Sequence, residues 1–158
     1  MSNRITLKLD IQNLIEKCIE IADKAGKEVN KIYQKKKLLI KNKIDDSPIT
    51  EADTCSHFLI IKALKSLTPD ITIISEEDEN NIKNESLFWL VDPLDGTKEF
   101  INKTGEYTIN MAWINNGVPI LGVISAPALG LVYTGGINHI AKKRDADGGG
   151  LTGTRWYR

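Results

Sequence analysis

Two aspartates, Asp92 and Asp95, stand three positions apart in the run W-L-V-D-P-L-D-G-T-K-E-F, which extends from Trp89 to Phe100. Gly96 lets the backbone approach a ligand closely, and Thr97 adds a hydroxyl where a helix should begin. The first turn of a helix offers free N–H groups to a phosphate. Carboxylates beside a phosphate would repel it unless divalent cations lay between them. The run therefore indicates a Mg²⁺-dependent phosphate-ester site.

A structural interpretation of the same run is a strand–turn–helix junction capped by an Asp, since D-P and D-G pairs are common in turns. Here both pairs occur together, after the apolar segment Leu87–Val91 and before a Thr-Lys-Glu sequence. Pro93 also fixes the backbone between the two carboxylates. The combination favours the catalytic interpretation over the structural one.

The run resembles the metal-binding signature D-P-(I/L)-D-G-T of the inositol monophosphatase superfamily. Its ending, Lys98-Glu99-Phe100, is similar to the CysQ branch of that superfamily, the 3′(2′),5′-bisphosphate nucleotidases. Three more stretches resemble the same branch: D-D-S-P-I-T-E-A-D at 45–53, I-I-S-E-E-D at 73–78, and residues 105–133. The resemblance covers roughly residues 11 to 135, in order and with sensible spacing.

The resemblance also implies a set of metal ligands. Glu76, Asp92 and the backbone carbonyl of Leu94 would hold a first Mg²⁺, and Asp92 and Asp95 would contribute to a second. Two or more such ions complete the family's site. Taken from its sequence context alone, Glu76 could equally be a solvated residue that opens an acidic loop. Its match to the S-E-E stretch and its spacing to Asp92 favour the ligand.

The catalytic residues implied by the resemblance are Asp53, Glu76 and Thr97. Asp53 would accept a hydrogen bond from Thr97, so that Thr97 and Glu76 together activate a water molecule. The backbone N–H groups of Gly96 and Thr97 would bind the substrate phosphate. Asp53 has a second interpretation, because it stands three residues after Thr50, where it could cap a helix.

The remaining chain supplies the elements that must position these residues. Apolar residues recur at helical spacing from Ile11 to about Tyr33, and a second helix begins at Thr50 and ends before Pro69. Strands are expected mostly later, with N-G as a hairpin signal, at 71–74, 87–91, 108–114, 119–125 and 131–134. This order predicts an α+β fold. The resemblance implies a layered α/β sandwich of the sugar-phosphatase type.

The length of 158 residues suits one compact domain, expected over residues 1–140. Residues 141–158 form an atypical Gly-rich tail that does not align to the family and is expected to be disordered. Family members continue into a second half with a W-D-x-x-A-G motif, which is absent here. The sequence therefore resembles the first half of such an enzyme, and its activity is expected to be impaired.

Composition excludes several classes of function. The 21 basic and 21 acidic residues balance, so no global field would recruit a nucleic acid polymer. No apolar run reaches the ~18 residues of a membrane span, and no secretory signal opens the chain. Cys18 and Cys55 are expected to be reduced structural thiols, which suits a cytoplasmic protein. Peripheral attachment to the inner membrane and a homo-oligomer are both compatible with this composition. His57 and His139 do not form a zinc site, and His57 is expected to be a partly buried, hydrogen-bonded side chain.

The leading hypothesis is a Mg²⁺-dependent phosphatase that removes the 3′-phosphate of adenosine 3′,5′-bisphosphate, a by-product of sulfate assimilation. An inositol or sugar monophosphatase is the alternative within the same class. A non-catalytic remnant that binds metal and phosphate is the alternative from a different class. The Lys98-Glu99-Phe100 ending favours the nucleotidase over the inositol branch.

Overall fold

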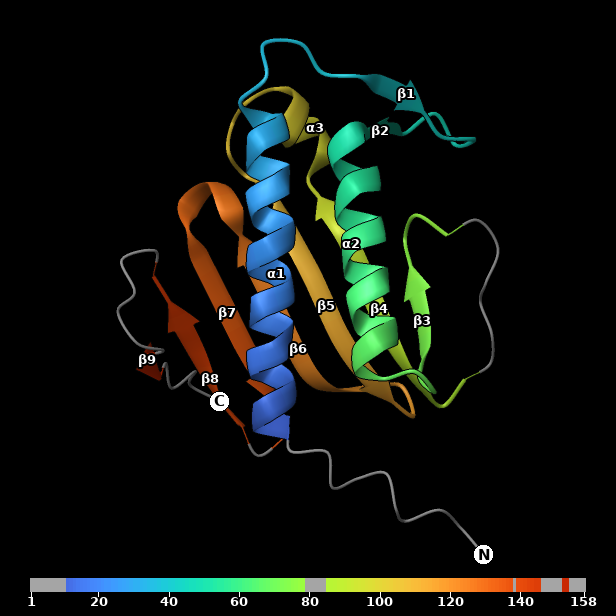
Figure 1. Ribbon diagram of the computed structural model, residues 1–158, viewed down its shortest axis with the longest axis vertical. Coiled ribbons are helices and arrows are strands. Elements are labelled where there is room, and N and C mark those ends of the chain that lie inside the picture. The colour runs from blue at the N-terminus through green and yellow to red at the C-terminus, as the bar shows by residue number, and fades with distance from the viewer. Residues whose placement is uncertain (1–10, 79–84, 138, 146–151, 154–158) are drawn as a thin grey trace, which may run out of the picture.

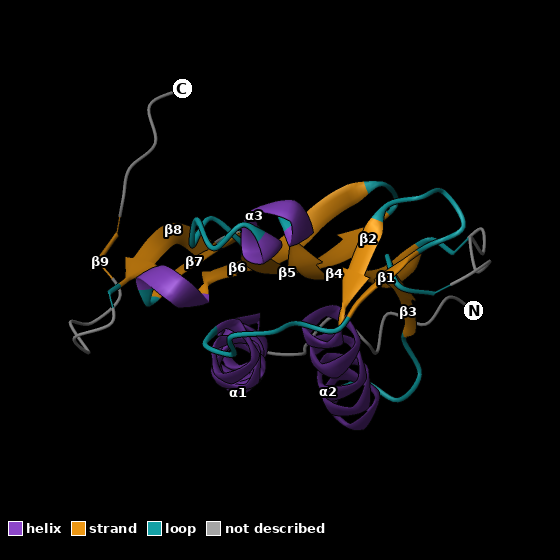
Figure 2. Cartoon of the chain, turned by 90° about the horizontal axis from the view of Figure 1, so that it is seen from above, coloured by secondary structure: helices purple, strands orange, loops and turns teal. Residues whose placement is uncertain are grey.

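The computed structural model describes residues 11–78, 85–137, 139–145 and 152–153. Two long helices, α1 (Ile11–Tyr33) and α2 (Glu51–Leu67), lie side by side over one face of a seven-stranded sheet (Figures 1 and 2). The α1 bounds match the expected helix, because its buried residues form the single stripe that the sequence shows. No helix in the described ranges is both long and apolar enough to cross a membrane.

The sheet is mixed but mostly antiparallel, as the α+β prediction requires. Its strands pair in sequence order from β3 to β9, and only the β3–β4 pair is parallel. Their bounds are β3 (Thr72–Ser75), β4 (Leu87–Asp95), β5 (Thr108–Asn115), β6 (Val118–Ala126), β7 (Leu131–Gly136), β8 (His139–Arg144) and β9 (Thr152–Gly153). The segment that connects α1 to α2 forms a separate two-stranded antiparallel ribbon of β1 (Ile40–Asn42) and β2 (Pro48–Thr50).

The turn between β5 and β6 confirms the hairpin signal. Asn116 and Gly117 connect the strands, with φ angles of 50° and 76°, and Asn115 pairs directly with Val118. Positive φ at both central residues is the type I′ geometry, which matches the twist of the flanking strands.

The core lies between the helices and the sheet. Trp89 and Trp113 stack across β4 and β5, with ring centroids 5.7 Å apart. The Trp89 indole N–H donates to Thr68 Oγ1 at 2.9 Å, which ties the end of α2 to the sheet. Cys18 and Cys55 are both free of disulfides, as the sequence predicts, and burial raises the pKa of Cys18 to about 12.

Some expected boundaries are wrong. The domain boundary expected after residue 140 falls inside β8, and the disorder expected for the tail is wrong at 141–144 and at Thr152–Gly153, which are strands. Arg144 explains part of the difference, because its guanidinium forms hydrogen bonds with both carboxylate oxygens of Asp23 on α1. A contact across the fold thus holds a strand that has no clear alternating pattern. The rest of the tail, apart from Asp145, lies outside the described residues.

Candidate active site

The paired aspartates lie on β4 itself rather than after it. β4 was expected to end at Val91, but it continues through Asp92-Pro93-Leu94 to Asp95. Pro93 lacks an N–H for the ladder, and the β4–β5 register shifts between Asp92 and Asp95 as a result. The Pro93 carbonyl instead accepts a 2.7 Å hydrogen bond from Ser56 Oγ on α2.

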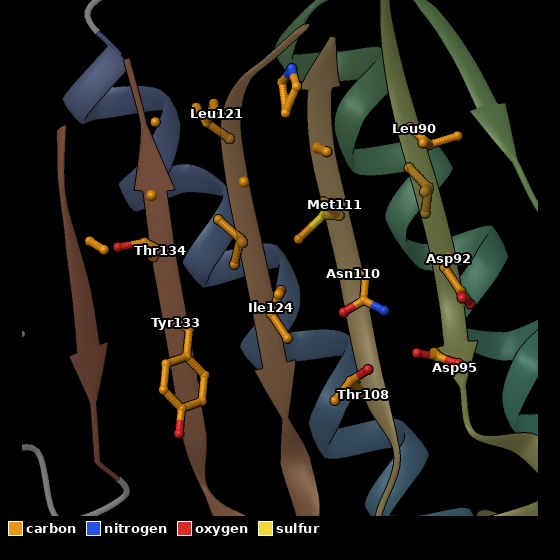
Figure 3. Close-up of a pocket in the computed structure, with 18 of the residues that line it drawn as sticks. Leu90, Asp92, Asp95, Thr108, Asn110, Met111, Leu121, Ile124, Tyr133 and Thr134 are labelled. Atoms are coloured by element: carbon orange, nitrogen blue, oxygen red, sulfur yellow. The ribbon is translucent and has the colours of Figure 1, made fainter. Parts of the chain in front are cut away.

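The local geometry of this segment fixes Asp92. The Leu94 N–H donates to Asp92 Oδ1 at 3.2 Å, and the Leu94 side chain is only 1% exposed. The buried Leu94 side chain therefore anchors the segment in the core, whereas the next residue, Asp95, is exposed. Figure 3 shows Asp92 and Asp95 together at one end of a pocket on the sheet face opposite the helices.

Asp53 makes both of the contacts that were considered for it. Its Oδ2 accepts from the Thr50 N–H at 2.7 Å and from Thr50 Oγ1 at 2.6 Å, which is one half of a capping box. Its Oδ1 accepts from Thr97 Oγ1 at 3.0 Å. The carboxylate is fully buried, so the start of α2 and the Thr97 hydroxyl are joined by a single rigid group.

Gly96 is required by the backbone at the start of α3 (Thr97–Ile101). Its φ is +84°, and a Cβ there would lie 2.7 Å from the Glu106 carbonyl oxygen. The turn therefore packs too closely against the backbone of Glu106 and Tyr107 for any side chain at position 96.

Glu76 is near the aspartates in the fold but is engaged elsewhere. It follows β3 directly, and its N–H donates to the Val91 carbonyl at 3.0 Å. Its carboxylate accepts from Lys43 Nζ at 3.2 Å, and Lys43 also donates to Glu77 at 2.7 Å. The Glu77 side chain is only 7% exposed against 53% for Glu76, so Glu77 is the more buried of the two carboxylates that Lys43 contacts. Lys43 is a residue of the site that sequence reasoning missed.

The electrostatics of the site centre on Asp92. Burial raises the pKa of Asp92 most, followed by the negative charge of Glu76, a hydrogen bond with Glu76 and the negative charge of Asp95, and together they bring it from 3.8 to about 7. The negative charges of Glu76 and Asp95 thus act on Asp92, and Lys43 is the cation that contacts Glu76 among the described residues. A divalent cation placed among them would remove this repulsion.

The donor set fits Mg²⁺ in chemistry, although the described residues contain no preformed cluster of three or more candidate ligand side chains. Asp92, Asp95 and Glu76 offer hard carboxylate oxygens, and Mg²⁺ retains several waters, so few protein ligands suffice. The Leu94 carbonyl accepts a 3.3 Å contact from Thr97 Oγ1 and belongs to the same segment. Glu76 is the ligand that would have to turn away from Lys43.

We predict that the metal-free protein loses stability as pH rises. The raised pKa of Asp92 means that the folded state still holds a proton, between pH 3.8 and about 7, that the unfolded state has released. This contribution to the free energy of unfolding is therefore present at low pH and is lost as pH rises through 7. Thermal unfolding at a series of pH values, with and without Mg²⁺, measures it. Added Mg²⁺ should raise the Tm more above pH 7 than at pH 5, and an equal rise at both would contradict the prediction.

Asn110 is a second residue of the site that sequence reasoning missed. It pairs with Asp92 in register and lies beside it in the pocket (Figure 3). Its Oδ1 is buried, and it has no hydrogen-bond partner within the described part of the chain. The signal was available, because the alternation Ile109, Met111, Trp113 places Asn110 on the opposite face. An unsatisfied buried oxygen beside a carboxylate suits a ligand that donates a hydrogen bond.

The pocket that contains these residues is a depression of about 1190 Å³ across the uncovered sheet face. Asp92 and Asp95 stand at one end, and small residues, including Ala112 and Gly122, line its middle. Ligand pockets are typically about 300–1,000 Å³, so this volume admits a substrate larger than a phosphate but does not select one.

The sequence is similar to known proteins over most of its length. A sequence model of the inositol monophosphatase family matches residues 10–145. The 3′(2′),5′-bisphosphate nucleotidase CysQ of Salmonella typhimurium is 44% identical over 124 residues, which are 76% of this chain and 50% of that protein. The CysQ protein of Buchnera aphidicola is 42% identical over 127 residues, which are 78% of this chain and 48% of that protein.

A comparison of structures gives the same result. The crystal structure of CysQ from Bacteroides thetaiotaomicron superposes with a TM-score of 0.72 at 34% identity, covering 87% of this chain and 51% of that one. The suhB protein of Bartonella henselae, at 24% identity and a TM-score of 0.76, shares the fold. The chain spans about half the length of the curated relatives it matches.

Proposed function

The chain belongs to the inositol monophosphatase family, and on that premise we propose that it acts as a Mg²⁺-dependent phosphomonoesterase of the CysQ type. Its substrate would be adenosine 3′,5′-bisphosphate, cleaved at the 3′-phosphate. The observation that supports this proposal best is the crowding of carboxylates at Asp92, which raises its pKa to about 7. A divalent cation bound at such a site would relieve the repulsion among the carboxylates and could also bind the oxygens of a phosphate ester. The Lys98-Glu99-Phe100 ending favours the nucleotidase branch.

The metal would be held by Asp92, Asp95, Glu76 and the Leu94 carbonyl. When bound, Mg²⁺ supplies charge neutralisation at the phosphoryl oxygens and a fixed frame for the attacking water and the departing alkoxide. The protein's part is to hold these oxygens in place. Pro93 and the buried Leu94 side chain restrict the segment between the two aspartates.

The proton of the attacking water would be handled by Thr97 and Glu76. Thr97 Oγ1 donates to the buried Asp53 carboxylate at 3.0 Å, which leaves its lone pairs to accept from water. Glu76 is the nearby base, and its hydrogen bond from Lys43 must break or lengthen before it can take a proton. The N–H groups of Gly96 and Thr97 would donate to the phosphate oxygens.

The proposal is tested by phosphate release from adenosine 3′,5′-bisphosphate and, in parallel, from myo-inositol 1-phosphate, each with and without Mg²⁺. Faster Mg²⁺-dependent release from the nucleotide supports the CysQ-type activity. Faster release from the inositol ester supports the alternative phosphatase. A chain that binds Mg²⁺ and phosphate but releases no product supports the non-catalytic remnant.

We predict that Thr97→Ala lowers kcat by more than tenfold, or roughly 1.4 kcal/mol of transition-state stabilisation, and leaves Mg²⁺ affinity nearly unchanged. The reason is that the hydroxyl contacts Asp53 and would accept a hydrogen bond from the attacking water, but it is not a proposed metal ligand. Thr97→Ser is the matched control, because it keeps the hydroxyl and should keep most of the turnover. Steady-state kinetics and calorimetry measure the two effects. Near-normal turnover in Thr97→Ala would show that water activation lies elsewhere.

A further inference from the structure

A histidine on α2 contacts the turn that carries Glu76 at two points. His57 Nδ1 lies 2.9 Å from Ser75 Oγ, and His57 Nε2 lies 3.6 Å from Asp78 Oδ1. The His57 side chain is only 12% exposed, which confirms the expected partly buried, hydrogen-bonded histidine. Its two contacts lie on either side of Glu76 in the chain.

The neighbours of the ring indicate which nitrogen holds the proton. The Asp78 carboxylate faces Nε2, so an N–H is favoured there and a lone pair would be repelled. Nδ1 then accepts from the Ser75 hydroxyl. Ser75 Oγ in turn accepts from the Glu77 N–H at 3.4 Å. The two hydrogen bonds thus run in one direction, from the Glu77 backbone through Ser75 to His57, and the other ring nitrogen of His57 faces the Asp78 carboxylate at 3.6 Å.

The face of α2 that carries His57 also carries Asp53, which contacts Thr97. Asp53 and His57 are four residues apart on α2 and therefore lie one above the other on one face. Asp53 fixes Thr97, and His57 contacts the residues that flank Glu76. The two groups proposed to activate water are consequently positioned by one rigid element.

We propose that His57 is a positioning residue for Glu76, an inference that rests on the proposed role of Glu76 as a metal ligand. Two backbone hydrogen bonds also hold the turn: the Glu76 N–H bonds to Val91 at 3.0 Å, and the Asp78 N–H bonds to Ser75 at 3.1 Å. Lys43 Nζ contacts the Glu76 carboxylate at 3.2 Å. Without His57, the turn keeps its backbone bonds and the contacts of Lys43 with Glu76 and Glu77, but it loses the two contacts that tie Ser75 and Asp78 to α2.

The experiment is a calorimetric titration of Mg²⁺ into the parent chain, His57→Ala and His57→Asn. Residues that orient metal ligands typically contribute about 10- to 100-fold to affinity, so His57→Ala should weaken Mg²⁺ binding by at least about tenfold. His57→Asn keeps a polar atom near Ser75 but cannot reach Asp78, so it should recover part of the loss. Unchanged affinity in His57→Ala would overturn the proposal.

His139→Ala is the matched control. The chain has 2 histidines, and His139 lies on β8 with its Nε2 3.3 Å from Thr134 Oγ1. A merely structural role for His57 would lower the Tm of His57→Ala without a specific loss of Mg²⁺ affinity. Equal losses of affinity in His57→Ala and His139→Ala would therefore also overturn the proposal.

A spectroscopic measurement separates this inference from the proposed function. Ring ¹⁵N shifts of the parent chain at about pH 8, assigned with His139→Ala, report the tautomer of neutral His57. Protonation at Nε2, with amide shifts in His57→Ala concentrated at 75–78, is the expected result. It can be obtained even if the parent chain binds no Mg²⁺, an outcome that would defeat the proposed function alone. Protonation at Nδ1 would overturn the contact scheme whether or not metal binds.

Discussion

Asp92→Asn is expected to abolish the calorimetric signal of Mg²⁺ binding. Asp92 is proposed to contact both ions, and an amide offers one neutral oxygen where the carboxylate offered two charged ones. The substitution preserves shape, and the Asn oxygen can still accept from the Leu94 N–H. The loss should therefore arise from ligand chemistry rather than from a change in the fold.

The same variant should be more stable than the parent when metal is absent. It removes a half-buried carboxylate whose pKa is raised to about 7 by partial burial and by Glu76 and Asp95. Above pH 7 the Tm of metal-free Asp92→Asn should be higher than that of the metal-free parent chain. Added Mg²⁺ should no longer raise the Tm of the variant. Asp70→Asn, at an exposed position after α2, is the matched control and should change neither quantity. Unchanged Mg²⁺ affinity in Asp92→Asn would refute the ligand assignment.

Gly96→Ala is expected to lower the free energy of unfolding by several kcal/mol. A non-glycine residue in the left-handed region costs about 1–3 kcal/mol. The added Cβ would also lie 2.7 Å from the Glu106 carbonyl and 3.3 Å from the Tyr107 Cα, so the backbone must shift. Overpacking of this kind typically costs about 1–3 kcal/mol more.

Gly117→Ala separates the cost of the left-handed backbone from the cost of the steric overlap. Its φ is +76°, close to that of Gly96, but a Cβ there meets nothing within 4 Å. It should therefore show the backbone cost without the steric one. Denaturant unfolding of both variants gives the difference, and phosphate binding should fall only in Gly96→Ala. Equal destabilisation of the two variants would mean that the turn at Gly96 adjusts freely.

The parts of the fold that sequence predicts well are those encoded locally. The helix 11–33 follows from a repeating apolar stripe, and the β5–β6 hairpin follows from Asn116-Gly117. β8 was missed because His139–Arg144 is stabilised partly through Arg144 and Asp23, which are 121 residues apart. β4 was expected to end too early because Pro93 looks like a strand breaker, whereas the structure places it at a register shift.

The site shows the same division. Asp92, Asp95, Gly96 and Thr97 are adjacent in the chain, and their meeting could be expected from spacing and resemblance. The Asp53–Thr97 contact was predicted from the resemblance, and the contact of Asp53 with Thr50 was predicted from the local sequence. The structure shows that one carboxylate makes both contacts. The contact of Lys43 with Glu76 could not be anticipated, because it depends on where the turn between β1 and β2 lies relative to the turn after β3.

The sequential pairing of the sheet also bears on how the chain reaches its fold. From β4 to β8, every strand pairs with the one that follows it, so the sheet can grow by successive closure of short loops. Such local contacts favour rapid formation, whereas α1 packs on β6 from the distant start of the chain. The meander around the Asn116-Gly117 turn is thus expected to form the folding nucleus, with α1 docking afterwards. Mutations in β5 and β6 would then slow refolding, and mutations in α1 would mainly speed unfolding.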